Sequence, residues 1–250
     1  MVVKYLRTFS CKFYKIKKQI PSQLYQMSRW TRNIQGLLNL FLESRCPLCD
    51  RSTNTEFCLD CTRQLQRCQL THPQQSEQQP LPIFVWGSYQ GTLKRAISSL
   101  KYENQPQIAH PLGIWLAKSW LTSPLATSQV IVVPIPLHAN RQKQRGYNQA
   151  ALIAESFCSC TGLKLQKSGL MRQKATEAQF NLSPQQREQN LNGAFELGID
   201  FCYHRPKMPV LLVDDIYTTG ATARVAAQTL QKQGIAVCGM VAIATSQGHN

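Results

Sequence analysis

Residues 210–223 read VLLVDDIYTTGATA. Four apolar residues predict a strand buried on both faces, and two aspartates, Asp214 and Asp215, follow them directly. A Thr/Gly turn then leads into a run with helical spacing, so the segment predicts a strand, a loop and the start of a helix. Ligands of an open α/β sheet bind at the carboxyl ends of its strands, which makes this loop a candidate binding site.

The residue types of the loop suit a sugar phosphate. Gly220 lets backbone N–H groups approach a phosphate closely, and the following helix directs its positive end toward it. Asp214 and Asp215 are within reach of vicinal ribose hydroxyls or a hydrated Mg²⁺. The alternative is a capped helix with no ligand, but capping alone requires neither adjacent carboxylates nor a double threonine. The predicted ribose 5-phosphate site comprises Asp214, Asp215, Thr218, Thr219, Gly220, Ala221 and Thr222.

Strands and helices alternate along the rest of the chain. We expect strands at 83–89, 130–136, 163–169, 210–213 and 235–244. Helical spacing predicts helices at 34–42, 91–101, 108–121, 149–158 and 221–233, with a polar helical turn at 183–190. Apolar strands that alternate with helices indicate an α/β fold whose parallel sheet is covered on both faces.

A cysteine pattern lies nearer the start of the chain. Cys46 and Cys49, then Cys58 and Cys61, form two CxxC pairs separated by eight residues. Two such pairs supply four thiolates in the tetrahedral arrangement of a structural Zn²⁺, and four protein ligands leave no open position for catalysis. Disulfide or redox use of the four is the alternative. Whether Cys68, which lies nearby, contributes to the metal site stays open.

Charge and composition divide the chain further. The 250 residues carry 28 Lys and Arg against 13 Asp and Glu, a net charge of +15 that favours polyanionic partners or phosphorylated substrates. Eight of the basic residues and no acidic ones lie in residues 1–42, and no apolar run is long enough to span a membrane. We expect a basic extension at 1–33, a four-cysteine zinc module at 34–68, a Gln/Pro-rich linker at 69–82 and the main domain at 83–247.

These motifs together resemble a known family. The sequence DDIYTTGAT is similar to the phosphoribosyl-pyrophosphate signature of type I phosphoribosyltransferases. Over about residues 37–245 the chain resembles the ComF family of competence proteins. The resemblance implies a type I phosphoribosyltransferase fold, a parallel sheet flanked by helices, with a small N-terminal zinc-ribbon-like module. It rests on the cysteine cluster, LKYENQP (100–106), VPIPLHANRQKQRGYNQA (133–150) and RQKATEAQFNLSPQQREQNLNGAF (172–195).

The same resemblance implies a diphosphate site and a closing loop. Arg141, Lys143 and Arg145 fall on a predicted loop, where guanidinium groups would bind diphosphate oxygens; a solvated basic loop is the alternative. Type I enzymes close a mobile loop over the reacting centre, and Arg172 or Lys174 would reach the diphosphate from it. The residues assigned to catalysis are Asp214, Asp215 and Lys174.

Two functions remain open from the sequence. The first is transfer of a phosphoribosyl group from phosphoribosyl pyrophosphate, with Mg²⁺, to an unidentified acceptor. The second is a non-catalytic protein that senses the same metabolite and binds nucleic acid. The resemblance also implies a role in DNA uptake, with single-stranded DNA or the competence machinery as partners, and a homo-oligomer stays open. We expect a cytoplasmic protein; the alternatives for the basic leader are an organelle transit peptide or a contact with an anionic membrane surface.

Overall fold

The computed structural model describes residues 44–71, 74–75, 81–173 and 193–246. Four predictions lie outside these residues: the basic extension at 1–33, the helix at 34–42, the helical turn at 183–190 and the catalytic role of Lys174.

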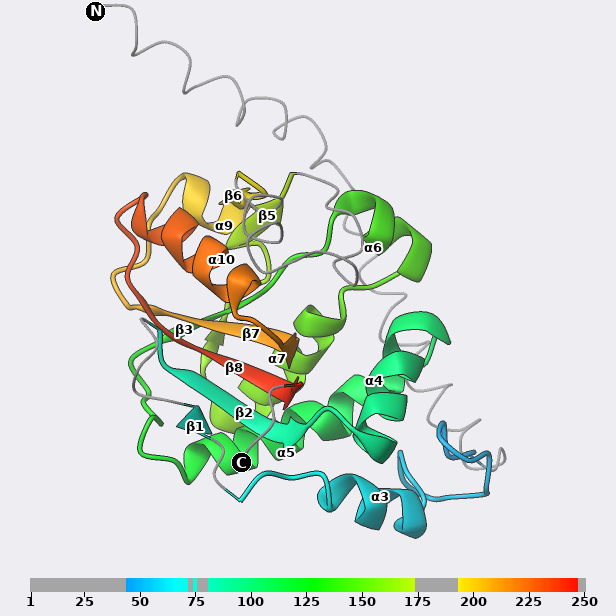
Figure 1. The fold of residues 1–250 in the computed structure, drawn as a ribbon. Coiled ribbons are helices and arrows are strands. Elements are labelled where there is room, and N and C mark those ends of the chain that lie inside the picture. The colour runs from blue at the N-terminus through cyan, green and yellow to red at the C-terminus, as the bar shows by residue number, and fades with distance from the viewer. Residues whose placement is uncertain (1–43, 72–73, 76–80, 174–192, 247–250) are drawn as a thin grey trace, which may run out of the picture.

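A parallel sheet forms the centre of the fold (Figure 1). Its five parallel strands are, in spatial order, β2 (Ile83–Ser88), β8 (Val237–Thr245), β7 (Val210–Tyr217), β3 (Ile131–Pro134) and β4 (Lys164–Leu165). A short strand within the predicted linker, β1 (Gln74–Gln75), pairs antiparallel with β2 at one edge. The predicted parallel sheet is therefore confirmed.

Helices cover both faces of this sheet, as the apolar strands predict (Figure 1). One face carries α10 (Ala221–Gln231), and the hairpin of β5 (Leu170–Arg172) and β6 (Phe195–Leu197) packs with it, followed by α9 (Ile199–Cys202). The other face carries α4 (Gly91–Tyr102), a 3-10 turn η2 (Pro106–Ile108), α5 (Ala109–Leu121) and α7 (Gln149–Thr161). No described helix combines the length and the apolar character needed to cross a membrane.

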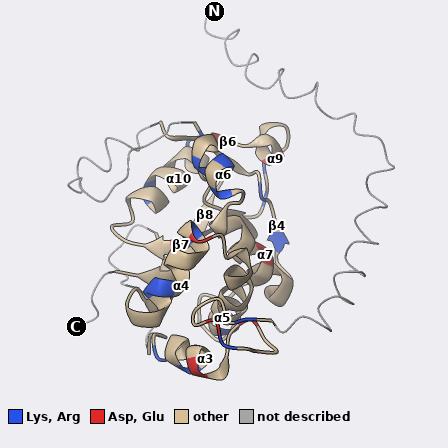
Figure 2. Ribbon diagram, turned by 90° about the vertical axis from the view of Figure 1, so that its right-hand side faces the viewer, with Lys and Arg blue, Asp and Glu red and all other residues tan. Residues whose placement is uncertain are grey.

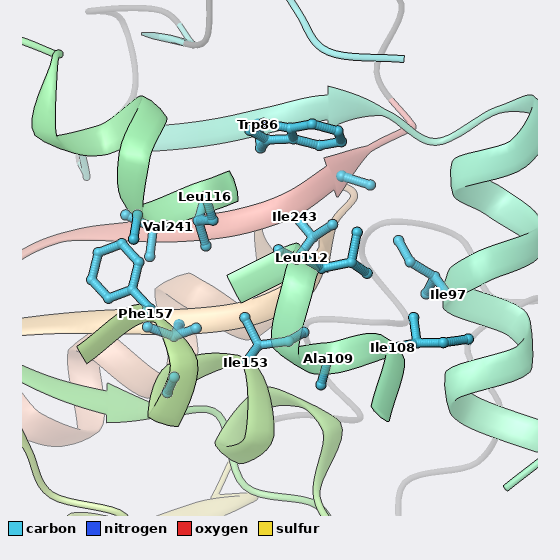
Figure 3. Close-up of a cluster of buried hydrophobic side chains, with 14 of the residues drawn as sticks. Trp86, Ile97, Ile108, Ala109, Leu112, Leu116, Ile153, Phe157, Val241 and Ile243 are labelled. Atoms are coloured by element: carbon cyan, nitrogen blue, oxygen red, sulfur yellow. The ribbon is translucent and has the colours of Figure 1, made fainter. Parts of the chain in front are cut away.

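The core on the α5 and α7 side is shown in Figure 3. Leu112 and Leu116 of α5 pack with Ile153 and Phe157 of α7 over the apolar face of β8. The two helices approach closely because α5 carries Gly113, where a Cβ atom would lie 2.6 Å from the backbone oxygen of Ile153.

The four-cysteine module is packed against this same core. Its helix α3 (Leu59–Gln66) buries Leu65, which belongs to one hydrophobic cluster with Trp86 of β2 and Leu93 of α4. The hydroxyl of Thr92 donates a 2.9 Å hydrogen bond to the side chain of Gln64, and thereby joins α3 to the first turn of α4. The module and the sheet domain thus share apolar packing as well as a chain connection.

Two predicted elements differ from the structure. The strand predicted at 210–213 continues as β7 to Tyr217, because β8 pairs with its second half through Asp214 with Ala242 and Ile216 with Ala244. Sheet pairing here overrides the low strand propensity of aspartate. The strand predicted at 163–169 forms only the two-residue edge strand β4, paired at Ile131 with Lys164 and at Val132 with Leu165.

Candidate functional site

The two aspartates lie in the second half of β7, at the end of the sheet toward which its parallel strands run. Successive strand residues point to opposite faces, so Asp215 shares its face with Val213 and the α4 side, whereas Asp214 shares its face with Leu212 and the α10 side. Asp215 is 3% exposed and Asp214 is half-buried. The main-chain N–H of Asp215 donates a 2.8 Å hydrogen bond to the carboxylate of Asp214, which holds the two groups in a defined relation.

A lysine that we did not predict as a site residue lies beside this pair. The Nζ atom of Lys101, in the last turn of α4, lies 3.0 Å from Oδ1 of Asp215. Burial lowers the pKa of Lys101, but the charge of Asp215, its hydrogen bond and the charge of Asp214 outweigh that effect and raise the pKa above its usual value. Lys101 is therefore a charged ammonium in a largely covered position. The signal available in the sequence is its position four residues after the buried Ile97, on the covered face of the helix.

The environment of Asp214 favours its protonated form. Burial and the adjacent charge of Asp215 raise the pKa of Asp214 from 3.8 to about 7. The charge of Lys101, the N–H of Asp215 and the charge of Arg172 oppose this shift in part. Two adjacent carboxylates in a poorly solvated site cannot both ionise easily, which is the physical cause of the shift.

The loop after β7 has the geometry that a phosphate site needs. Gly220 precedes α10 with a φ of 73°, and a Cβ atom there would lie 2.7 Å from the hydroxyl of Tyr217. The guanidinium of Arg224 donates a 2.9 Å hydrogen bond to the carbonyl of Thr219, which ties the loop to the helix. Thr218 is exposed and Thr222 lies in the first turn of α10, so the predicted loop residues are adjacent at the helix N-terminus.

The predicted basic loop is a helix, which corrects one expectation. Arg141, Lys143 and Arg145 lie on α6 (Ala139–Arg145), which Gly146 ends with a φ of 82°. The ring nitrogen Nδ1 of His138 accepts the main-chain N–H of Asn140 and caps the helix. A capped first turn and a glycine end convert the polar stretch into a helix.

This short helix faces the same region as the acid pair. The guanidinium of Arg145 lies 5.7 Å from the ring centre of Tyr102, the residue after Lys101, and hydrogen-bonds to the side chain of Gln149. Figure 2 shows the basic residues of α6 above the end of β7, where acidic and basic residues meet. The chain therefore brings α6 and the C-terminal turn of α4 together around β7.

Arg172 links these groups electrostatically. It forms an isolated backbone bridge with His138, immediately before α6. Burial and the charge of Arg141 lower the pKa of Arg172, and the charge of Asp214 raises it in part. Arg172 thus lies within the electrostatic range of both the acid pair and α6. Of the two residues predicted to reach the diphosphate from the closing loop, Arg172 is described, and it lies beside His138 at the start of α6.

The four cysteines form a separate candidate metal centre. The sulfur atoms of Cys46, Cys49, Cys58 and Cys61 all lie within 4.8 Å of one another. The N–H of Cys49 and the N–H of Asp50 both donate to the carbonyl of Cys46, at 3.3 and 2.8 Å, and form the tight turn that places two ligands side by side. These four residues could hold a metal ion with every position filled by protein.

Cys46 belongs to the four-cysteine group, whereas the nearby Cys68 does not. Burial raises the pKa of the Cys46 thiol, but hydrogen bonds from the backbone of Cys58 and Leu48 outweigh it and lower the pKa to about 7. Cys68 is not in the group; its thiol is directed at the carbonyls of Gln64 and Gln90, at 3.5 and 3.7 Å. Cys68 therefore packs between α3 and the start of α4.

The chain is similar to competence proteins and to DNA utilization proteins. It is 30% identical to competence protein F of Haemophilus influenzae, over 80% of this chain and 90% of that protein. It is 28% identical to the DNA utilization protein YhgH of Escherichia coli, over 76% of this chain and 86% of that one, and 26% identical to competence protein ComFC of Bacillus subtilis, over 76% and 72%. No protein-family model matches the sequence.

Two adenine phosphoribosyltransferases are among the solved structures with partial similarity. The Leishmania donovani enzyme aligns with a TM-score of 0.37 and 14% identity, over 68% of this chain and 74% of that chain. The Leishmania tarentolae enzyme aligns with a TM-score of 0.35 and 17% identity, over 59% and 62%.

Proposed function

Since this chain belongs to the ComF family, we propose that its sheet domain binds phosphoribosyl pyrophosphate and serves DNA uptake or use, as the names of its relatives suggest. The observation that carries the proposal is the arrangement around the end of β7. There, an acid pair, a glycine-containing loop at a helix N-terminus and the basic helix α6 occupy one region. These three features match the hydroxyls, the 5-phosphate and the diphosphate of that metabolite.

Each part of the ligand has a proposed set of partners. Backbone N–H groups of the first turn of α10 and the hydroxyls of Thr218, Thr219 and Thr222 donate to the 5-phosphate. The carboxylates of Asp214 and Asp215 accept hydrogen bonds from the ribose hydroxyls. Asp215 has a buried carboxylate oxygen, Oδ2, with no hydrogen-bond partner among the described residues, which indicates that a ligand group completes its bonding.

We assign the diphosphate to the basic side chains of α6. Arg141 and Lys143 are exposed on α6, and Arg145 lies half-buried against Tyr102. Arg172 borders α6 through its bridge with His138, and the charges of Arg141 and Asp214 both act on it. Mg²⁺, when bound together with the diphosphate, would offset part of its negative charge.

Transfer of the phosphoribosyl group is the catalytic form of this proposal. The lone pair of an acceptor would form a bond to the anomeric carbon as the bond from that carbon to pyrophosphate breaks, and the leaving pyrophosphate would carry the electron pair. Arg141, Lys143, Arg145 and Lys174 would stabilise the negative charge on the leaving group, while the acid pair holds the ribose.

Calorimetric titration with phosphoribosyl pyrophosphate tests the binding site. The double variant Asp214→Asn/Asp215→Asn should lose binding. The control Asp60→Asn changes an exposed side chain of α3 and should bind as the wild type does. Unchanged affinity in a double variant with a normal melting curve would overturn the site. Pyrophosphate release with a panel of nucleobases and amines then separates the two forms of the proposal, because a sensor binds the metabolite without releasing pyrophosphate.

A nucleic-acid-binding sensor is the second candidate, and the net charge of +15 favours it. Binding of single-stranded and duplex DNA should weaken steeply as salt rises, because cationic residues release counterions from the phosphates. A salt-independent affinity would argue against this role.

We also infer that the metal of the cysteine module is zinc. Four cysteine thiolates in a tetrahedral arrangement are characteristic of structural Zn²⁺. In such a site the protein fills all four coordination positions. Metal analysis of the purified chain should give one zinc per chain, and a Cys46→Ser/Cys49→Ser variant should lose it.

A further inference from the structure

The acid pair of β7 is charge-balanced by the protein itself. Lys101 contacts Asp215 at 3.0 Å, and the charges of Lys101 and Arg172 both act on Asp214. With both carboxylates ionised, this group of four has a formal charge of zero. Protonation of Asp214, which its raised pKa favours, makes the group positive and still less attractive to a cation. The two cations come from elements far apart in sequence, α4 and β5, so the balance is a product of the tertiary fold.

Because of this balance, the acid pair does not need a divalent cation to offset its negative charge. A divalent cation binds where carboxylates leave both uncompensated negative charge and free oxygen atoms. At Asp215 an ammonium already occupies one oxygen, and the lysine is itself only 17% exposed. A divalent cation placed at the pair would be repelled by Lys101, and the repulsion is strong because the surroundings are poorly solvated.

We propose that Lys101 takes the place of a divalent cation at the ribose end of the site, so that ribose 5-phosphate binds this protein without Mg²⁺. Lys101 is a positioning residue here: it keeps the carboxylate of Asp215 neutralised and oriented, and the ribose hydroxyls contact the carboxylates. The inference rests on the proposed ribose 5-phosphate site and adds that its metal independence comes from one buried lysine. Any need for Mg²⁺ is then confined to the diphosphate.

Removing the lysine should create a metal requirement. In Lys101→Met the pair would carry its negative charge without the adjacent ammonium, and a metal ion could take the vacated position. Titration calorimetry with ribose 5-phosphate, in magnesium-free buffer and with excess Mg²⁺, measures this. Magnesium is omitted and not chelated, so that the cysteine module keeps its own metal.

The wild type should bind ribose 5-phosphate with the same affinity, within about threefold, in both buffers. Lys101→Met should bind about tenfold more weakly or worse without Mg²⁺, and Mg²⁺ should restore much of the loss. Lys101→Arg keeps the cation and should stay independent of Mg²⁺. Lys94→Met, an exposed lysine on the same helix, is the matched control and should behave as the wild type does.

The other outcomes distinguish a failure of the role of Lys101 from a failure of the ribose 5-phosphate site. Wild-type binding that requires Mg²⁺, or equal binding by Lys101→Met in both buffers, overturns the role of Lys101 and leaves the ribose site intact. If the wild type binds ribose 5-phosphate in neither buffer, the proposed site fails and this inference fails with it. If melting curves show that Lys101→Met does not fold, the wild-type comparison between the two buffers decides alone.

Discussion

The guanidinium of Arg145 lies 5.7 Å from the ring centre of Tyr102, so the basic helix α6 rests on the residue that follows Lys101. Tyr147 reinforces this contact, since its hydroxyl donates a 2.6 Å hydrogen bond to the carbonyl of Leu100. The C-terminal turn of α4 therefore joins the proposed diphosphate side of the site to the acid pair.

Removing the Tyr102 ring should weaken pyrophosphate binding. The ring is exposed, and a cation–π contact at an exposed position contributes about 0.5–1 kcal/mol, so Tyr102→Ala should lower affinity by about two- to fivefold. Calorimetry with inorganic pyrophosphate measures the effect. Tyr102→Phe retains the ring and is the control; equal affinities for the two variants would argue that the contact does not position Arg145.

Gly220 should be less tolerant of substitution than a glycine with the same backbone conformation. Gly220 and Gly234 have φ values of 73° and 76°, so alanine at either costs about 1 kcal/mol of backbone strain. Only at Gly220 would the new Cβ atom also meet the Tyr217 hydroxyl, at 2.7 Å, because nothing lies within 4 Å at Gly234. Gly220→Ala should therefore show the lower melting temperature and the weaker binding of ribose 5-phosphate. Equal losses in both variants would contradict a tightly constrained loop.

The free energy of unfolding should fall as the pH rises toward the pKa of Asp214 in the folded protein. Its pKa is about 7 in the folded protein against an ordinary value of 3.8, so between these pH values the folded protein holds a proton that the unfolded chain releases. Unfolding then releases a proton, and the free energy of unfolding decreases as pH rises through this window, by up to about 1.4 kcal/mol per pH unit. Denaturant titrations across the window should show this slope in the wild type and a flatter profile in Asp214→Asn. Parallel profiles would show that Asp214 titrates near its ordinary value.

Loss of metal from the cysteine module should destabilise the whole described fold. Cys46, Cys58 and Cys61 belong to one hydrophobic cluster with the sheet and α4, so their release would expose shared core. Cys58→Ser should reduce bound metal and lower the free energy of unfolding by roughly 4 kcal/mol, with a single unfolding transition. Cys160→Ser, outside the metal group, should retain metal and stability. A separate early transition for the module would contradict shared packing.

Local patterns in the sequence were sufficient for the elements and for parts of the site. Largely apolar runs at 83–89 and 235–244 predicted β2 and β8, because strands of a covered parallel sheet are apolar on both faces. The acid pair, the glycine turn and the two CxxC pairs are contiguous or closely spaced, so their chemistry could be recognised without knowing the fold. Element ends were less accurate, since pairing with β8 extends β7 through two aspartates.

Relations between distant segments required the tertiary structure. Lys101 and Asp215 are separated by more than a hundred residues, and only the packing of α4 against the sheet brings them to 3.0 Å. Arg172 and α6 also meet only through tertiary packing, and the cysteine module packs against the core of the sheet domain. Residue types and short spacings determine which groups can bind a phosphate or a metal. Burial and through-space distance determine their charge, because a carboxylate titrates according to its neighbours in space.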